Sequence, residues 1–222
     1  MTTFADLGVS ADFVAALEAR GITSPFPVQE LTIPDALAGR DVCGKAKTGS
    51  GKTLAFGLPV LETVAAATPR RPRALILVPT RELANQVEAV VKQLVGPYST
   101  IKSALLIGGE PMPKQQAQLR MRPRIIVGTP GRIIDHLQRG SLMLHDAGFL
   151  VLDETDAALD EANSQKYGDM IENLAKQTQL MVVTHNRETM SRADIIYGVT
   201  LGSDDSSTLL SIRFEEAVKV AK

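Results

Sequence analysis

The sequence predicts an α/β fold built as a three-layer αβα sandwich, with a mostly parallel central sheet and a C-terminal β-ribbon. Three observations predict it. Short β-branched runs alternate with longer helical patterns along most of the chain. A glycine-containing loop at residues 46–53 follows one such run and precedes a helical pattern. Another apolar run, residues 149–152, ends in two carboxylates.

The apolar runs place the elements in chain order. Helices are expected after the first, second, fourth and fifth strands, for example at residues 81–94 and 164–176, where apolar positions recur at helical spacing. Beyond residue 186, a polar turn at 202–206 separates two strands of a ribbon, and residues 215–222 suit a short helix. The expected sheet strands are 41–44, 74–78, 103–107, 124–127, 149–153 and 180–184, and the ribbon strands are 193–201 and 208–214.

Composition bounds the class of protein. The chain has 222 residues, of which 44% are hydrophobic, so residues 1–222 suit one large α/β domain. With 24 Lys and Arg against 25 Asp and Glu, nucleic-acid binding would need local features rather than net charge. We see no run that suits a membrane span or signal peptide, and we expect a cytoplasmic protein that does not bind membranes. The single Cys43 suits a buried structural thiol.

The loop at residues 46–53 predicts a P-loop NTPase. Glycines let backbone N–H groups close around phosphates, Lys52 reaches the outer phosphates, and the Thr53 hydroxyl is a ligand for Mg²⁺ at the start of a helix. The cofactors expected here are ATP or ADP with Mg²⁺. The predicted nucleotide-binding residues of the loop are Ala46, Lys47, Thr48, Gly49, Ser50, Gly51, Lys52 and Thr53, with Ala46 in place of the usual first glycine.

Two acidic residues end the apolar run at 149–152. Asp153 and Glu154 should emerge at the carboxyl end of a buried strand, where open α/β sheets bind ligands. Asp153 then suits Mg²⁺ binding, and Glu154 suits orienting or deprotonating an attacking water. The pair taken alone is equally well explained as an acidic helix start. The upstream phosphate loop favours the catalytic interpretation.

Ordered motifs stand in the first two thirds of the chain, at residues 21–29 with Phe4 upstream, 79–84, 108–109, 129–132 and 153–156. Together they resemble the motifs of DEAD-box RNA helicases, and residues 153–156 depart from the family's name motif only by Thr155. Residues 1 to about 150 thus resemble the family's first RecA-like domain. The resemblance implies that Gln29 hydrogen-bonds adenine, with Phe4 and Ile22 nearby and Ile22 where the family usually stacks an aromatic.

The same resemblance implies an RNA-backbone site. Its residues would be Thr80, Arg81, Gly109, Thr129 and Arg132, which meet phosphates and sugars without reading sequence. Without the resemblance, residues 79–84 suit a helix start and 129–131 suit a turn.

Beyond Asp156 the pattern differs. The family's Ser-Ala-Thr is absent, and Thr184-His185-Asn186 stands after the next strand. Residues 151–222 are similar to the C-terminal part of SMC-type ATPase heads, of the ABC-like branch, and this resemblance implies that 157–160 is a D-loop and His185 a catalytic sensor of the γ-phosphate. Taken alone, His185 suits a structural histidine at a strand end.

These two resemblances lead us to expect an engineered chimera joined near residue 150. We expect Mg-ATP or Mg-ADP binding with at most slow hydrolysis by a weak ATPase, and no helicase activity, because neither an SMC signature loop nor a second helicase domain with its arginine finger is seen. A non-catalytic nucleotide- and RNA-binding module, or a scaffold with an impaired site, remain alternatives. The expected partners are nucleotide and, weakly, RNA backbone, for a monomer or a weak homodimer formed through the ribbon edge.

Overall fold

Strands from distant parts of the chain pair in one sheet, in the order β3-β4-β2-β5-β6-β1-β7-β8 when numbered along the sequence. The computed structural model describes residues 2–45, 49–67, 73–96, 99–193, 195–201 and 207–213. The strands are β1 (Val42–Lys45), β2 (Ala74–Leu77), β3 (Ser103–Leu106), β4 (Ile125–Gly128), β5 (Phe149–Asp153), β6 (Gln179–Val183), β7 (Ile195–Leu201) and β8 (Ser207–Arg213). Every pairing is parallel except β7 with β8. The predicted, mostly parallel αβα fold is confirmed.

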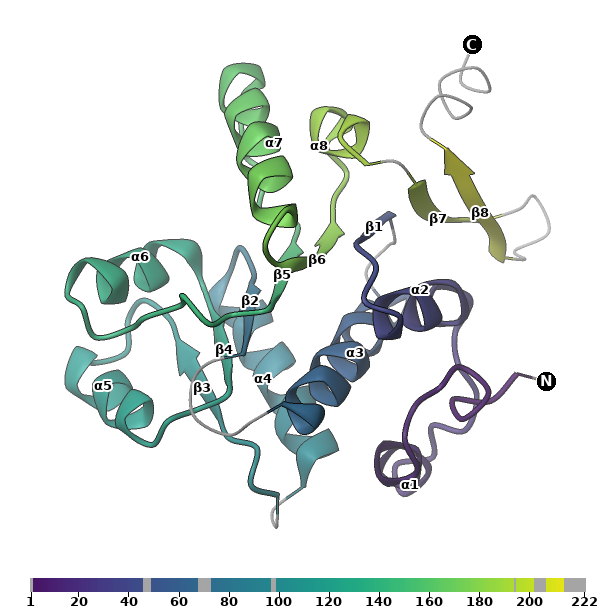
Figure 1. Cartoon of the computed structure of the whole chain (residues 1–222), viewed down its shortest axis with the longest axis horizontal. Coiled ribbons are helices and arrows are strands. Elements are labelled where there is room, and N and C mark those ends of the chain that lie inside the picture. The colour runs from purple at the N-terminus through teal and green to yellow at the C-terminus, as the bar shows by residue number, and fades with distance from the viewer. Residues whose placement is uncertain are drawn as a thin grey trace.

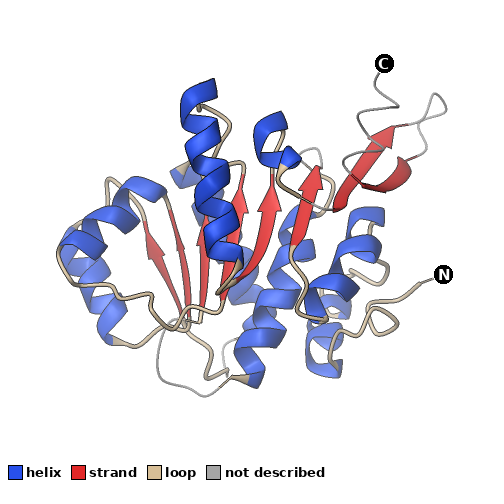
Figure 2. Ribbon diagram, turned by 45° about the horizontal axis from the view of Figure 1, so that its top comes forward, coloured by secondary structure: helices blue, strands red, loops and turns tan. Residues whose placement is uncertain are grey.

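Helices cover both faces of this sheet, as Figure 2 shows. One face packs against the first four helices, and the other packs against the three that follow. They are α1 (Ala11–Glu18), α2 (Pro27–Leu37), α3 (Lys52–Ala66), α4 (Arg81–Val95), α5 (Met112–Arg120), α6 (Pro130–Gln138) and α7 (Glu161–Ala175), followed by the short α8 (Arg187–Ser191). No helix of the described residues is long and apolar enough to cross a membrane.

Alternation along the strands divides the core in two. Ile76 and Val151 belong to the cluster beneath α3 and α4, whereas Leu75, Leu150 and Leu152 belong to the cluster beneath α6 and α7. Because β5 pairs with β2 on one side and β6 on the other, all five of its residues are buried. A strand buried on both faces is expected to be a continuous apolar run, as residues 149–152 are.

The described strands agree with the predicted ranges to within two residues. The predicted ribbon is present as β7 and β8, but it also extends the main sheet, because β7 pairs in parallel with β1. The predicted turn at 202–206 and helix at 215–222 lie outside the described residues. Cys43 is a buried free thiol, as predicted, and burial raises its pKa to about 12.

Four helices were missed by the sequence analysis, namely α1, α2, α5 and α8. In α5 only Gln115 is buried, so no apolar stripe marks it. In α2 the interior Pro34 argues against a helix, yet the element forms because its other face is packed on α3 and β7. Tertiary packing therefore decides both.

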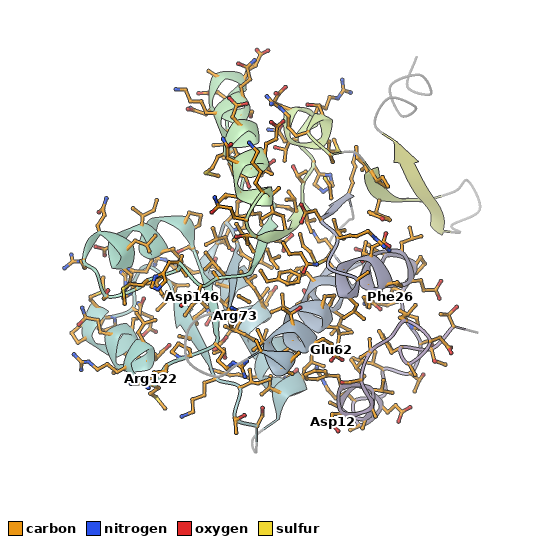
Figure 3. All side chains as sticks on the ribbon, viewed as in Figure 1. Asp12, Phe26, Glu62, Arg73, Arg122 and Asp146 are labelled. Atoms are coloured by element: carbon orange, nitrogen blue, oxygen red, sulfur yellow. The ribbon has the colours of Figure 1, made fainter. Side chains whose placement is uncertain are left out.

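Two arginines make hydrogen bonds at the edge of the sheet where the strands begin. Arg73 donates to the carbonyl of Asp146 at 3.4 Å, just before β5, and both residues are labelled in Figure 3. Arg124 donates to the carbonyls of Val64 and Ala67 at the end of α3. Burial, and secondarily Arg73, lower the pKa of Arg124. The Arg73 contact joins the start of β2 to the segment before β5, and the Arg124 contacts join the start of β4 to the end of α3.

Gly128 makes the packing of β4 testable. A Cβ at this position would lie 2.5 Å from the carbonyl oxygen of Leu106 and 2.9 Å from Ile133 Cδ1. We expect Gly128→Ala to lower the unfolding free energy by about 1–3 kcal/mol, because the β3 backbone has to move. The matched control is Gly57→Ala within α3, where nothing lies within 4 Å and helix propensity predicts a gain of up to about 1 kcal/mol. Equal effects in denaturant unfolding would contradict this account.

Candidate functional site

The loops that leave β1, β2, β3, β4, β5 and β6 gather at the carboxyl edge of the sheet. Parallel strands bring their carboxyl ends to one edge, and ligands of open α/β sheets bind there. Figure 1 shows α3, α4 and α6 starting from this arrangement. Two sites lie along the edge, one around Lys52 and one between the starts of α4 and α6.

Gln29 holds the end of the phosphate loop in the first site. It is buried, with its Oε1 accepting from the Phe26 N–H at 2.8 Å and its Nε2 donating to the Gly51 carbonyl at 3.0 Å. Gly51 has φ +85°, and a Cβ there would lie 2.4 Å from Gln29 Nε2. Phe26 lies at the start of α2, as labelled in Figure 3, and is half exposed. The loop end therefore requires glycine for conformation and for space.

Lys52 lies between the two acidic residues that end β5. Its Nζ forms an ion pair with Glu154 Oε1 and lies 3.8 Å from Asp153 Oδ1. Glu154 has φ +53°, a left-handed conformation uncommon outside glycine, while its N–H donates to the Val183 carbonyl at 2.7 Å. In this conformation the Glu154 side chain reaches Lys52. Residues 102 positions apart thus meet in one cluster.

Asp153 has a buried oxygen, Oδ1, that faces Lys52 without accepting a hydrogen bond from any of the described residues. Its side chain is only 4% exposed. Burial raises the pKa of Asp153 to about 6, Lys52 opposes that shift, and Glu154 adds to it. A buried carboxylate oxygen without a partner fits a divalent cation. Thr53, the predicted second ligand, lies in the first turn of α3, and its metal role stays a prediction. Mg²⁺ takes one or two protein ligands and completes its shell with phosphates and water.

A buried carboxylate, Asp156, links the β5 loop to the loop after β6. Its Oδ2 accepts from the Thr184 hydroxyl at 2.6 Å and from the Thr189 hydroxyl of α8. The Thr184 hydroxyl in turn accepts from the Asn186 N–H at 2.9 Å. Between them, His185 is half exposed, with Nε2 3.8 Å from Glu154 Oε1. His185 is therefore placed beside the Lys52–Glu154 pair, although its predicted sensor role stays a prediction.

The sequence analysis missed the part played by Asp156 and Thr189. No local pattern pairs a carboxylate with hydroxyls 28 and 33 residues away. The available signal was polarity within an apolar context, since a charged side chain with little exposure has to find hydrogen-bond donors.

The second site is an open cleft of about 540 Å³. Four of the five residues predicted for RNA line it, and the fifth, Gly109, adjoins its lining residue Gly108. Arg81 packs over these glycines, since a Cβ on Gly109 would lie 2.6 Å from Arg81 Nη1. The lining residues are Pro79, Thr80, Arg81, Glu82, Gly108, Thr129, Gly131 and Arg132.

The remaining residues predicted to bind nucleotide differ in their burial. Phe4 lies in the main core at 2% exposure, and the partly buried Ile22 packs against that core. Gly49 is exposed with φ +84° and Ser50 is half-buried. Ala46, Lys47 and Thr48 lie outside the described residues.

Comparison with known proteins matches the sequence of this chain to one family. A family model described as DEAD/DEAH box helicase matches residues 26–191. DEAD-box ATP-dependent RNA helicase 28 of rice (Oryza sativa subsp. japonica) is 39% identical over 99% of this chain and 28% of its own length. Human probable ATP-dependent RNA helicase DDX27 is 37% identical over 98% and 27%. Rice DEAD-box ATP-dependent RNA helicase 53 is 42% identical over 80% and 30%. The chain thus spans less than a third of these relatives.

The predicted join near residue 150 is wrong. The matched family region runs through this position to residue 191, and two of these relatives align over 98–99% of the chain. The hydrogen-bonded register of β5 with β2 and β6 also continues through residue 150 without interruption. The interpretation of residues 151–222 as part of an SMC-type head is therefore not supported, and that of residues 1–150 as helicase-like extends further along the chain.

Asp153 gives the site a measurable pH dependence. Its pKa of about 6 in the folded protein exceeds the ordinary 3.8, so the unfolded state loses its proton first as pH rises. The contribution of the protonated Asp153 carboxyl to the free energy of unfolding is fully present below pH 3.8 and is lost as the pH rises through 6. In the absence of Mg²⁺, we expect Asp153→Asn to be more stable than the parent by on the order of 3 kcal/mol near pH 7.5 and by about 1 kcal/mol near pH 4.5.

Thermal unfolding across this pH range checks the expectation. Asp12→Asn, at an exposed position of α1, is the control and should show a small difference that changes little with pH. A gain for Asp153→Asn that stays constant with pH would contradict the assignment of the pKa shift to this carboxyl.

Proposed function

Since the chain belongs to the DEAD/DEAH box helicase family, we propose that it is the ATP- and RNA-backbone-binding domain of an ATP-dependent RNA helicase. The observation that carries the proposal is that the Lys52 cluster and the arginine-lined cleft open at the same edge of one sheet. Three relatives bear the name ATP-dependent RNA helicase. The earlier expectation of an engineered hybrid without helicase activity is overturned by these matches.

The first half of the proposal concerns ATP. Lys52 now pairs with Glu154, and an incoming phosphate group competes for the same ammonium. Transfer of Lys52 to the phosphates frees the Glu154 carboxylate to orient a water and accept its proton. Mg²⁺, when bound, would neutralise negative charge on the phosphates. Asp153 and Thr53 would hold it, and the raised pKa of Asp153 would fall as the cation replaced its proton.

The second half concerns RNA. Helices α4 and α6 begin at the cleft, so their free N–H groups and positive ends face any bound phosphate. Arg81 and Arg132 add full positive charges to the lining of the cleft. Thr80 caps α4 by accepting from the Leu83 N–H at 3.2 Å. Backbone N–H groups, hydroxyls and guanidinium groups contact the phosphate backbone of any sequence, so the proposed binding is sequence-independent.

His185 extends the first half. We propose that it is a γ-phosphate contact next to Glu154, on the strength of its 3.8 Å separation from that carboxylate. A neutral ring nitrogen that donates a hydrogen bond suits a phosphate oxygen. This role depends on nucleotide entering beside Lys52.

The RNA site is tested by a charge removal. Arg132→Ala should weaken binding of a labelled single-stranded RNA roughly tenfold and reduce the salt dependence of binding by about one phosphate contact. Arg120→Ala is the matched control, because Arg120 is the last residue of α5, is exposed and lies outside the cleft lining. Equal losses in both variants, measured by fluorescence anisotropy at several salt concentrations, would point to general charge instead of this cleft.

The ATP site is tested through ligand-induced stability. A hundredfold excess of Mg-ADP over Kd should stabilise the parent by about 2.7 kcal/mol in thermal unfolding. Lys52→Ala should lose this response, whereas Lys92→Ala, whose ammonium pairs with Glu88 on α4, should retain it. A parent protein that unfolds cooperatively and ignores Mg-ADP would refute nucleotide binding at this loop.

A further inference from the structure

A buried chain of polar side chains lies behind the RNA cleft and ends on the turn at Gly108 and Gly109. From its geometry we propose that Gln115 and His136 are positioning residues for RNA binding, which hold this turn where Arg81 and Arg132 meet the phosphate backbone. The inference rests on the proposed function. Neither residue lines the cleft, and their exposures are 1% and 0%, so both act through the turn instead of touching RNA.

Gln115 hydrogen-bonds the backbone on both sides of the turn. Its Nε2 donates to the Ile107 carbonyl at 2.9 Å and to the Glu110 carbonyl at 3.2 Å, and these two carbonyls flank the pair of glycines. Both amide hydrogens are used in this way. The orientation of the amide is therefore determined, because the reverse placement would set its oxygen against two carbonyl oxygens. Gln115 Oε1 is left facing α6.

His136 of α6 completes the contact. Its Nε2 lies 3.2 Å from Gln115 Oε1, and its Nδ1 lies 2.8 Å from Ser141 Oγ. Burial above all lowers the pKa of His136, which favours the neutral ring. Since Gln115 presents an oxygen, the ring carries its hydrogen on Nε2, and Nδ1 is left to accept from the Ser141 hydroxyl, for which the His136 carbonyl at 3.1 Å is a second acceptor. The orientation of the Gln115 amide thus determines which nitrogen of His136 carries the hydrogen.

The turn in turn positions both cleft arginines. The Glu110 carbonyl that accepts from Gln115 also accepts from Arg132 Nη1 at 2.9 Å. On the other side, the Arg81 guanidinium lies against Gly108 and Gly109, which have no side chains in its way. A shift of the turn therefore moves the carbonyl that orients Arg132 and the surface on which Arg81 rests. Well-placed guanidinium groups bind phosphate in two-point geometry, so such a shift weakens binding.

The Gln115 and His136 side chains are more polar than filling this buried space requires. An apolar side chain at position 115 would fill the same space but would leave the Ile107 carbonyl without its Gln115 donor, and the Glu110 carbonyl with Arg132 but without Gln115. A buried group that loses its partner incurs a desolvation penalty, which the backbone relieves by moving. The expected consequence is a displaced turn within an otherwise intact domain.

The test compares RNA binding with ADP binding in the same variants. Gln115→Leu should raise the Kd for a labelled single-stranded RNA roughly tenfold, and His136→Leu several-fold, with Mg-ADP affinity unchanged within about twofold. His136→Gln keeps an N–H donor near Gln115 and should restore RNA affinity to within about twofold of the parent. The double variant to Leu should be no weaker than Gln115→Leu alone, because both residues act through one turn.

Three outcomes are decisive. Parent-like RNA affinity in Gln115→Leu, with Arg132→Ala still weak, overturns the positioning role and leaves the proposed function standing. Equal losses of RNA and ADP affinity show general destabilisation and also overturn it. A parent that binds no RNA refutes the RNA half of the proposed function, and this inference with it. Should Gln115→Leu fail to fold, the contrast between His136→Leu and His136→Gln decides the question, since neither change removes a donor from the two carbonyls.

Discussion

Parallel pairing of β5 with β2 and β6 is the constraint on which both candidate sites depend. The pairing sets Leu152 opposite Leu77 and Val182, so the strands end together. Their loops then deliver Asp153, Glu154 and Thr184 to one edge, beside the Lys52 loop from β1. The same alignment, continued through β4 and β3, brings the starts of α4 and α6 together with the glycine turn. Neither site exists within one element alone.

The two buried aspartates at the end of β5 and just beyond it show how this edge combines stability with reactivity. Asp156 accepts two hydroxyl hydrogen bonds, which compensate for the loss of water and join the loop to α8. Asp153, three residues earlier, keeps an oxygen without a hydrogen-bond partner among the described residues, and its pKa is raised to about 6. Burial with incomplete hydrogen bonding opposes stability, and such groups concentrate where ligands bind. The different environments separate a structural carboxylate from one suited to a cation.

Local motifs predicted correctly where several residues lie, but they led to the wrong prediction of a join near residue 150. The Asp153-Glu154 pair and the run before it are shared by many P-loop proteins, because any buried parallel strand that ends at a phosphate site meets the same demands. Residues 184–186 departed from the expected helicase motif, and that departure suggested a join. Yet Thr184 still donates to Asp156, and the family match continues to residue 191. A changed side chain in one loop is compatible with an unchanged sheet.

The sequence by itself determined the strands, the acidic end of β5 and four of the residues that line the cleft between α4 and α6, because these depend on apolar periodicity and on short motifs. Only the tertiary structure decided that α2 and α5 are helices, that Gln29 closes onto Gly51, and that Lys52 pairs with Glu154. It alone brought Gln115 and His136 together behind the cleft. These contacts join residues 21 to 102 positions apart, and a side-chain hydrogen bond at such separation depends on packing that no local pattern records.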